Sequence, residues 1–112
     1  MIELPLPFVQ HHEAMIVLCE KFGVDKLYVF GSVAKNQFNS KSSDIDLLVE
    51  MEPMPPIERG ENLMSLWDAF EYLFARKVDL LTDQPIRNPY LRQNIEETKR
   101  LIYDRKRTEV PF

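Results

Sequence analysis

The chain has 112 residues, of which 45% are hydrophobic and 29% are charged, and its 14 basic and 18 acidic residues give a net charge of −4. This length supports a single domain spanning residues 1–112. The net negative charge argues against a protein that mainly coats nucleic acid. No apolar run approaches the roughly 20 residues that cross a bilayer, and the first residues lack the basic stretch and apolar core of a secretory signal.

The chain contains one cysteine, Cys19. A single cysteine excludes an internal disulfide and is typical of a reducing compartment, so we expect a cytoplasmic protein. The lack of a long apolar run predicts no membrane partner, and the net negative charge predicts that nucleic acid is not a direct partner. Cys19 and the single tryptophan, Trp67, both lie on apolar helical stripes. We therefore expect both side chains in the hydrophobic core, and for Trp67 a base-stacking role is the alternative.

Apolar residues at helical spacing predict a first helix over residues 7–22, and Gly23 suits its left-handed end. The β-branched and aromatic run at 26–30 predicts a strand. A polar stretch over 35–43 separates it from a second predicted strand at 44–50.

A second long helix is predicted over 57–74, followed by a strand at 77–82 and a helix at 88–99. Residues 101–103 either prolong this last helix or form a short edge strand. This order of elements is typical of an α/β fold with a small mixed β-sheet flanked by helices.

A glycine and a serine, Gly31 and Ser32, follow the first predicted strand directly. Glycine lets the backbone turn sharply and approach a ligand closely. If Ser32 and the next residues open a short helix, their N–H groups attract anions such as phosphate. Taken alone, the pair more often marks an ordinary turn from strand to helix.

Two acids, Asp44 and Asp46, flank Ile45 at the start of the second predicted strand. Alternate side chains of a strand share a face, so both carboxylates project to one side, about 7 Å apart along the backbone. Because like charges repel and a charge in an apolar strand is costly, the pair indicates a bound cation. Hard oxygen ligands favour Mg²⁺ or Mn²⁺. A solvent-facing strand end is the alternative, and it fits Asp44 better than Asp46.

A third acid, Asp79, lies in a segment that echoes residues 44–48. If the two strands pair, Asp79 lies beside Asp46 and three acids converge on one point of the sheet. Alone, Asp79 fits a tolerated acid of an edge strand equally well. Together with phosphate-binding amides, the three acids predict a site for nucleotidyl transfer assisted by a pair of Mg²⁺ ions.

The chain resembles the minimal nucleotidyltransferases of the DNA polymerase beta superfamily over nearly its whole length. Their signature is a Gly-Ser pair, a spacer, an Asp-x-Asp strand and a later single Asp. Here it reads Gly31-Ser32, then Asp44-Ile45-Asp46, then Asp79. The resemblance implies a polymerase-beta-like nucleotidyltransferase fold, with Asp44, Asp46 and Asp79 as catalytic metal ligands for two Mg²⁺ ions.

The same resemblance implies that Gly31 and Ser32 hold the triphosphate of ATP. Many relatives have Arg-Gly where this chain has Lys35-Asn36. Lys35 keeps a positive charge that can reach a phosphate, although not through two parallel hydrogen bonds, and Asn36 tolerates left-handed backbone angles.

The resemblance extends to the MntA-like antitoxins of HEPN/MNT toxin–antitoxin pairs. It implies a HEPN-like helical partner, a hetero-oligomer, and transfer of AMP from ATP to a tyrosine of that HEPN ribonuclease toxin. Two other functions remain open. The chain can be an antitoxin that neutralises its partner by contact without catalysis, or one subunit of a two-chain nucleotidyltransferase for a small molecule.

Overall fold

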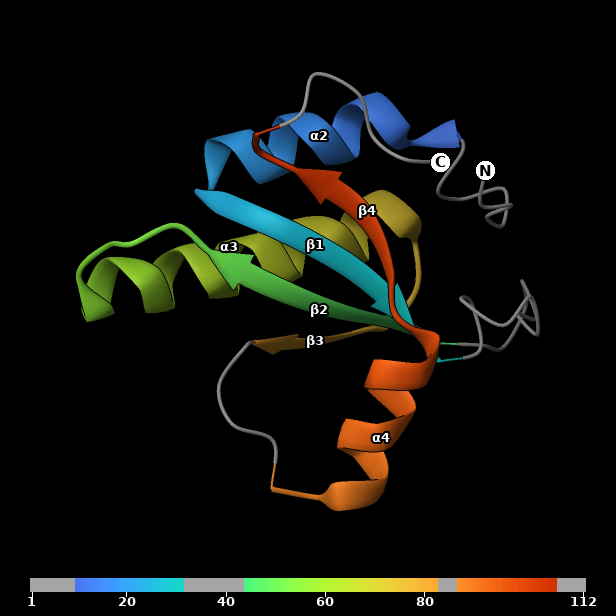
Figure 1. Ribbon diagram of the computed structural model, residues 1–112. Helices are drawn as coiled ribbons and strands as arrows, with labels where there is room; N and C mark the ends of the chain where they lie inside the picture. The colour runs from blue at the N-terminus through green and yellow to red at the C-terminus, as the bar shows by residue number, and fades with distance from the viewer. Residues whose placement is uncertain (1–9, 32–43, 83–86, 107–112) are drawn as a thin grey trace.

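The computed structural model describes residues 10–31, 44–82 and 87–106. Within these ranges the elements follow in the order α2 (His12–Lys21), β1 (Val24–Phe30), β2 (Ile45–Met51), α3 (Pro56–Phe74), β3 (Val78–Thr82), α4 (Pro89–Thr98) and β4 (Arg100–Asp104) (Figure 1). No helix in this part of the chain combines the length and the hydropathy that crossing a bilayer requires.

The four strands form one mixed sheet in the order β3-β2-β1-β4. Strand β1 is antiparallel to both β2 and β4, whereas β2 and β3 are parallel. In the register of the sheet, Asp46 of β2 lies between Phe30 of β1 and Asp79 of β3. The predicted α/β class with a small mixed sheet is therefore confirmed.

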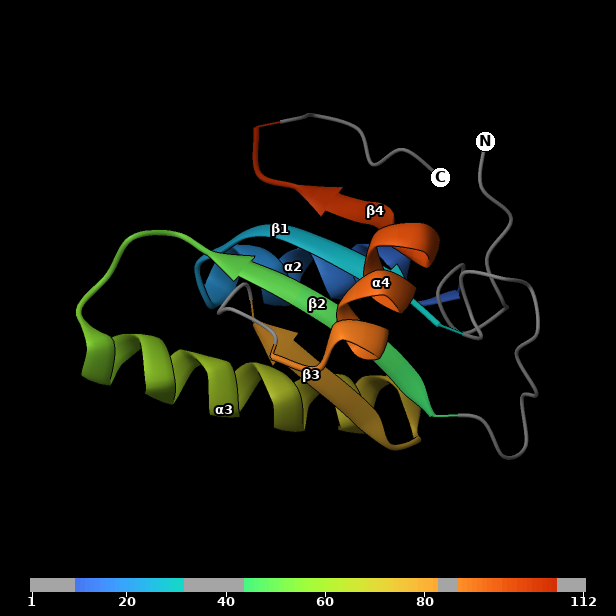
Figure 2. The same ribbon diagram turned by 60° about the horizontal axis from the view of Figure 1, so that its bottom comes forward.

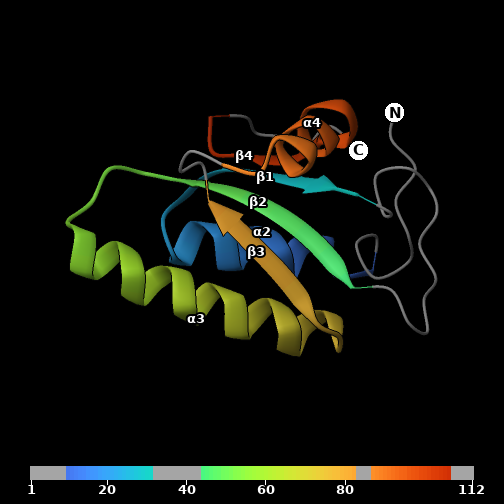
Figure 3. The ribbon, with the colours of Figure 1, turned by 90° about the horizontal axis from the view of Figure 1, so that it is seen from below.

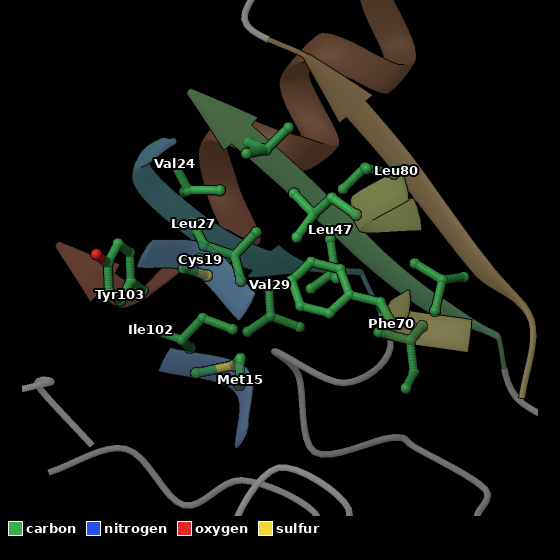
Figure 4. Packing of buried hydrophobic residues seen from close by; sticks show 14 of the residues in the cluster. Met15, Cys19, Val24, Leu27, Val29, Leu47, Phe70, Leu80, Ile102 and Tyr103 are labelled. Carbon is green, nitrogen blue, oxygen red and sulfur yellow. The ribbon is translucent and has the colours of Figure 1, made fainter. Parts of the chain in front are cut away.

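The helices divide between the two faces of the sheet. Figure 3 shows α2 and α3 on one side of the strands and α4 on the other. The face under α2 and α3 carries the main core, part of which Figure 4 shows from close by. Its fully buried members include Met15, Cys19, Leu27, Val29, Ile45, Leu47, Leu66, Phe70 and Ile102. The expectation that Cys19 belongs to the core is confirmed.

The opposite face is covered by α4, which lies in front of the sheet in Figure 2. A smaller apolar cluster of Phe30, Leu48 and Ile95 joins this helix to β1 and β2. Because alternate residues of a strand share a face, Asp46 projects to the same side as Leu48. The α4 face of the sheet is thus where the acidic side chains lie.

The helix boundaries follow from capping residues. Asn88 caps the start of α4. Its side-chain oxygen accepts hydrogen bonds from the backbone N–H groups of Tyr90 and Leu91 at 2.9 and 3.2 Å. Helix α2 ends just before Gly23, whose φ of +75° is the left-handed conformation that the sequence predicts. Helix α3 begins with Pro56 at its first turn, a position that suits proline.

Some boundaries differ from the predictions. Strand β1 begins at Val24, before its predicted start, because Val24 pairs with Met51 across an irregularity in the ladder. Residues 101–103 lie in β4, an edge strand, and do not prolong α4. Residues 7–9 of the predicted first helix and the polar stretch at 35–43 lie outside the described residues.

The expectation that Trp67 is a core residue is wrong, because its side chain stays 40% exposed. Its indole Nε1 donates a 2.6 Å hydrogen bond to the carbonyl oxygen of Val78, at the start of β3. The backbone N–H of Val78 donates to Oε2 of Glu71 at 2.9 Å. Two side chains of α3 therefore satisfy backbone groups of β3, the outer strand on this side of the sheet.

Candidate active site

Asp46 and Asp79 lie side by side on adjacent parallel strands. They are direct partners in the register of β2 and β3, and both side chains are half-buried. The echo between the two strand sequences produces this arrangement, because each acid follows one buried aliphatic residue and precedes another. The prediction that the two strands pair and bring Asp79 beside Asp46 is confirmed.

The neighbouring carboxylates perturb each other. Burial raises the pKa of Asp46 to about 6, and the negative charge of Asp79 beside it adds to the rise, with a smaller contribution from Asp44. Both effects disfavour the charged form of the carboxyl group. This pair is unfavourable as a purely structural feature, and it is the donor set that a hard divalent cation would stabilise.

Asp44 is exposed and precedes β2. Its Oδ2 lies 4.0 Å from Nζ of Lys77, a surface ion pair across the start of the two parallel strands. Among residues 10–31, 44–82 and 87–106, no three His, Cys, Asp or Glu side chains are grouped as a metal site. The structure therefore brings two of the three predicted acids together, and the third acid points to a lysine nearby.

Gly31 directly follows β1 and packs against the carboxylate of Asp46. Its φ is +73°, and a Cβ at this position would lie 2.6 Å from Oδ2 of Asp46. Both observations exclude a side chain here, since left-handed backbone angles are costly for other residues and the contact is closer than atoms allow. The turn after β1 is thus in contact with the carboxylate of Asp46.

The backbone N–H of Gly31 is already bonded. It donates to Oγ1 of Thr98 at 3.0 Å, and that hydroxyl donates to the carbonyl oxygen of Asn94 at 2.6 Å. Thr98 is 3% exposed, so helix α4 holds the glycine turn from inside the fold. The N–H group of Gly31 is consequently engaged within the fold, and its backbone lies close to the carboxylate of Asp46.

The role of Thr98 does not follow from any motif. The sequence does, however, indicate that Thr98 is buried. Thr98 lies at helical spacing from Leu91 and Ile95, which are both apolar, on one face of α4. A hydroxyl on a buried helical stripe implies a buried hydrogen-bond partner. The other predicted phosphate-binding residues, Ser32 and Lys35, lie outside the described residues.

A pocket of about 280 Å³ opens beside the two acids. Asp46 and Asp79 form part of its wall, and most of the remaining wall is apolar and comes from β1, β3, α3 and α4. Trp67 lines it from α3, and Leu91 and Asn94 line it from α4. The site thus combines paired carboxylates, a close backbone turn and an adjoining apolar pocket.

Known proteins are similar to this chain over most of its length. A family model described as a nucleotidyltransferase domain matches residues 16–102. The chain is also 40% identical over 87 residues to a Methanocaldococcus jannaschii protein whose name proposes protein adenylyltransferase activity. The match covers 78% of this chain and 83% of that relative.

Solved structures share the fold. A structure described as a proposed minimal nucleotidyltransferase superposes with a TM-score of 0.66 at 29% identity, covering 83% of this chain and 90% of that chain. The fold is also similar to a chain in the complex of tri-AMPylated Shewanella oneidensis HEPN toxin with MNT antitoxin. There the TM-score is 0.52 at 20% identity, over 86% of this chain and 71% of that chain.

Proposed function

The chain belongs to the nucleotidyltransferase domain family, and from this premise we propose that it transfers AMP from ATP to a tyrosine of a partner protein. The proposed partner is a HEPN ribonuclease toxin, which the modification would inactivate, so that the chain acts as the antitoxin. The names of the M. jannaschii relative and of the S. oneidensis complex support this proposal.

The observation that carries the proposal is the pair of carboxylates, Asp46 and Asp79, of which Asp46 is in contact with Gly31. Asp46 and Asp79 supply adjacent oxygens, and Asp44 lies close enough to raise the pKa of Asp46. These three residues would hold a divalent cation, because carboxylate oxygens are the donors that Mg²⁺ prefers. When bound, such a cation covers phosphate charge and lowers the pKa of an attacking hydroxyl.

The residues of the chain position the reaction. Because Gly31 has no Cβ, its backbone can lie directly against the carboxylate of Asp46. We place the phosphates of ATP beside this contact. The tyrosine oxygen forms a bond to the α-phosphorus of ATP, and the bond from that phosphorus to pyrophosphate breaks. The hydroxyl proton passes to the carboxylate of Asp79, which lines the pocket beside the reacting centre.

The test is AMP transfer to the co-purified HEPN partner, measured by intact mass in the presence of ATP and Mg²⁺. We expect the partner to gain one or more AMP groups with the unaltered chain and none with Asp79→Asn. Asp68→Asn is the matched control, because it removes the same charge from an exposed position on α3. A partner that gains no AMP with the unaltered chain overturns the proposal. Neutralisation of the toxin by Asp79→Asn would instead indicate an antitoxin that acts by contact.

A further inference from the structure

The pocket beside Asp46 and Asp79 has features that transfer of a nucleotide alone does not require. Its volume of about 280 Å³ lies just below the roughly 300–1,000 Å³ typical of pockets for drug-sized ligands. That size suits one ring better than a whole nucleotide. Among the described residues that line it, the polar groups are the two carboxylates, the amide of Asn94 and the indole N–H of Trp67, which is already bonded to Val78.

Trp67 gives the pocket a fixed aromatic wall. The 2.6 Å hydrogen bond from its Nε1 to the carbonyl oxygen of Val78 ties the indole to the outer edge of β3. The side chain is nevertheless 40% exposed. An indole that is held by a hydrogen bond and open to the pocket is a surface on which a planar ring can pack, edge to face or offset.

The position of the pocket relative to the glycine turn indicates which substrate enters it. In the sheet, Gly31 follows β1 on one side of Asp46, whereas Asp79, Leu81 and Trp67 lie toward the β3 side. Gly31 itself does not line the pocket. In phosphoryl transfer the attacking and leaving oxygens lie roughly in line, on opposite sides of the phosphorus. With the phosphates at the glycine turn, the attacking group approaches from the pocket.

We propose that this pocket binds the aromatic ring of the acceptor, with Trp67 and Leu91 as its walls, and so selects a phenolic hydroxyl. The inference rests on the proposed function and adds the residues that choose the acceptor. A serine or threonine would leave the apolar walls unfilled. A purine carries several ring nitrogens, and the apolar side chains that make up most of the described wall offer them no hydrogen-bond partners, which is unfavourable.

The binding test needs neither ATP nor the partner. Trp67 is the only tryptophan in the chain, so its indole N–H gives a single assignable resonance in ¹H–¹⁵N spectra of the full chain. We expect p-cresol to shift this resonance in a saturable way and adenosine to leave it unchanged. A shift with adenosine and none with p-cresol would mark the pocket as a base site and overturn the inference, and so would no shift with either compound.

A variant links the pocket to the acceptor. Leu91→Phe adds volume to the wall on α4 and should raise KM for the acceptor partner at least tenfold, while the Kd for ATP stays within twofold. Tyr90→Phe is the control, because Tyr90 is the adjacent residue, is 83% exposed and does not line the pocket. An unchanged KM in Leu91→Phe, or an equal loss of ATP affinity, contradicts the inference.

The two proposals fail separately. If the partner gains AMP normally but neither p-cresol nor Leu91→Phe has an effect, the ring pocket is refuted and the transferase proposal stands. If p-cresol binds at Trp67 but no AMP transfer occurs, the ring pocket is supported and the transferase proposal is refuted.

Discussion

Removing the charge of Asp46 should make the ligand-free protein more stable, although it removes a residue of the proposed active site. Burial and the charge of Asp79 raise the pKa of Asp46 from its ordinary 3.8 to about 6. At about 1.4 kcal/mol for each pH unit, this corresponds to roughly 3 kcal/mol against the charged form in the folded state. Because the side chain is only half-buried, solvent screens part of this cost, and we expect Asp46→Asn to gain about 1 to 2 kcal/mol.

The gain should depend on pH with a definite sign. The folded protein binds the proton of Asp46 more tightly than the unfolded chain does, so the stability of the unaltered protein falls as the pH rises from about 4 to about 6. The full cost is present above pH 6. The advantage of Asp46→Asn should therefore be largest at neutral pH and disappear only at a pH well below the ordinary pKa of 3.8, where the carboxyl group is protonated in both the folded and the unfolded state.

The assay is thermal unfolding followed by circular dichroism, with a chelator present. For a domain of this size each kcal/mol raises Tm by about 4 to 8 °C. Asp68→Asn, which removes an exposed charge from α3, should leave Tm unchanged. Added Mg²⁺ should raise Tm of the unaltered chain and not that of Asp46→Asn. A variant at Asp46 that is equally or less stable at neutral pH would refute the reasoning, because the carboxylate would then be a net stabilising group.

Further substitutions test the surroundings of the site, and a thiol reaction tests the core. Gly31→Ala should lower stability by about 1 to 3 kcal/mol, measured by chemical denaturation, because φ is +73° and the new Cβ would meet Asp46. Thr98→Val should cost about 1 to 3 kcal/mol and reduce AMP transfer, because it leaves the N–H of Gly31 without its partner. Thr98→Ser, which keeps the hydroxyl, should recover most of both. Cys19 should react with a thiol reagent only as fast as the protein unfolds, since it is fully buried and burial raises its pKa; rapid reaction in native buffer would show that α2 opens locally.

The pairing of Asp46 with Asp79 could be predicted because it depends on local patterns. Both strands have a short apolar sequence with one acid at the same position, and two parallel strands in register bring such positions together. The bond from Gly31 to Thr98 could not be predicted in the same way. It joins residues 67 positions apart, and only the packing of α4 across the sheet makes them neighbours.

The position of Trp67 shows where periodicity is insufficient. The residues Leu66, Phe70 and Phe74, which lie at helical spacing along α3, are buried. Trp67 is adjacent to Leu66 and lies at the margin of the same stripe, where a small rotation of the helix decides between core and solvent. Whether the Trp67 side chain is buried or exposed depends on the position of β3 at the edge of the sheet. The sequence of α3 alone does not specify that position.

Side chains of α3 occupy backbone hydrogen-bonding groups at the outer edge of β3. This has a consequence for how the protein can associate. An outer strand with free amide and carbonyl groups is a template on which a second chain can add, and repeated addition leads to fibres. At Val78 both groups are already engaged by α3. Cross-molecular strand addition at that point would first have to displace an indole and a carboxylate, so this route to aggregation is obstructed at the start of β3.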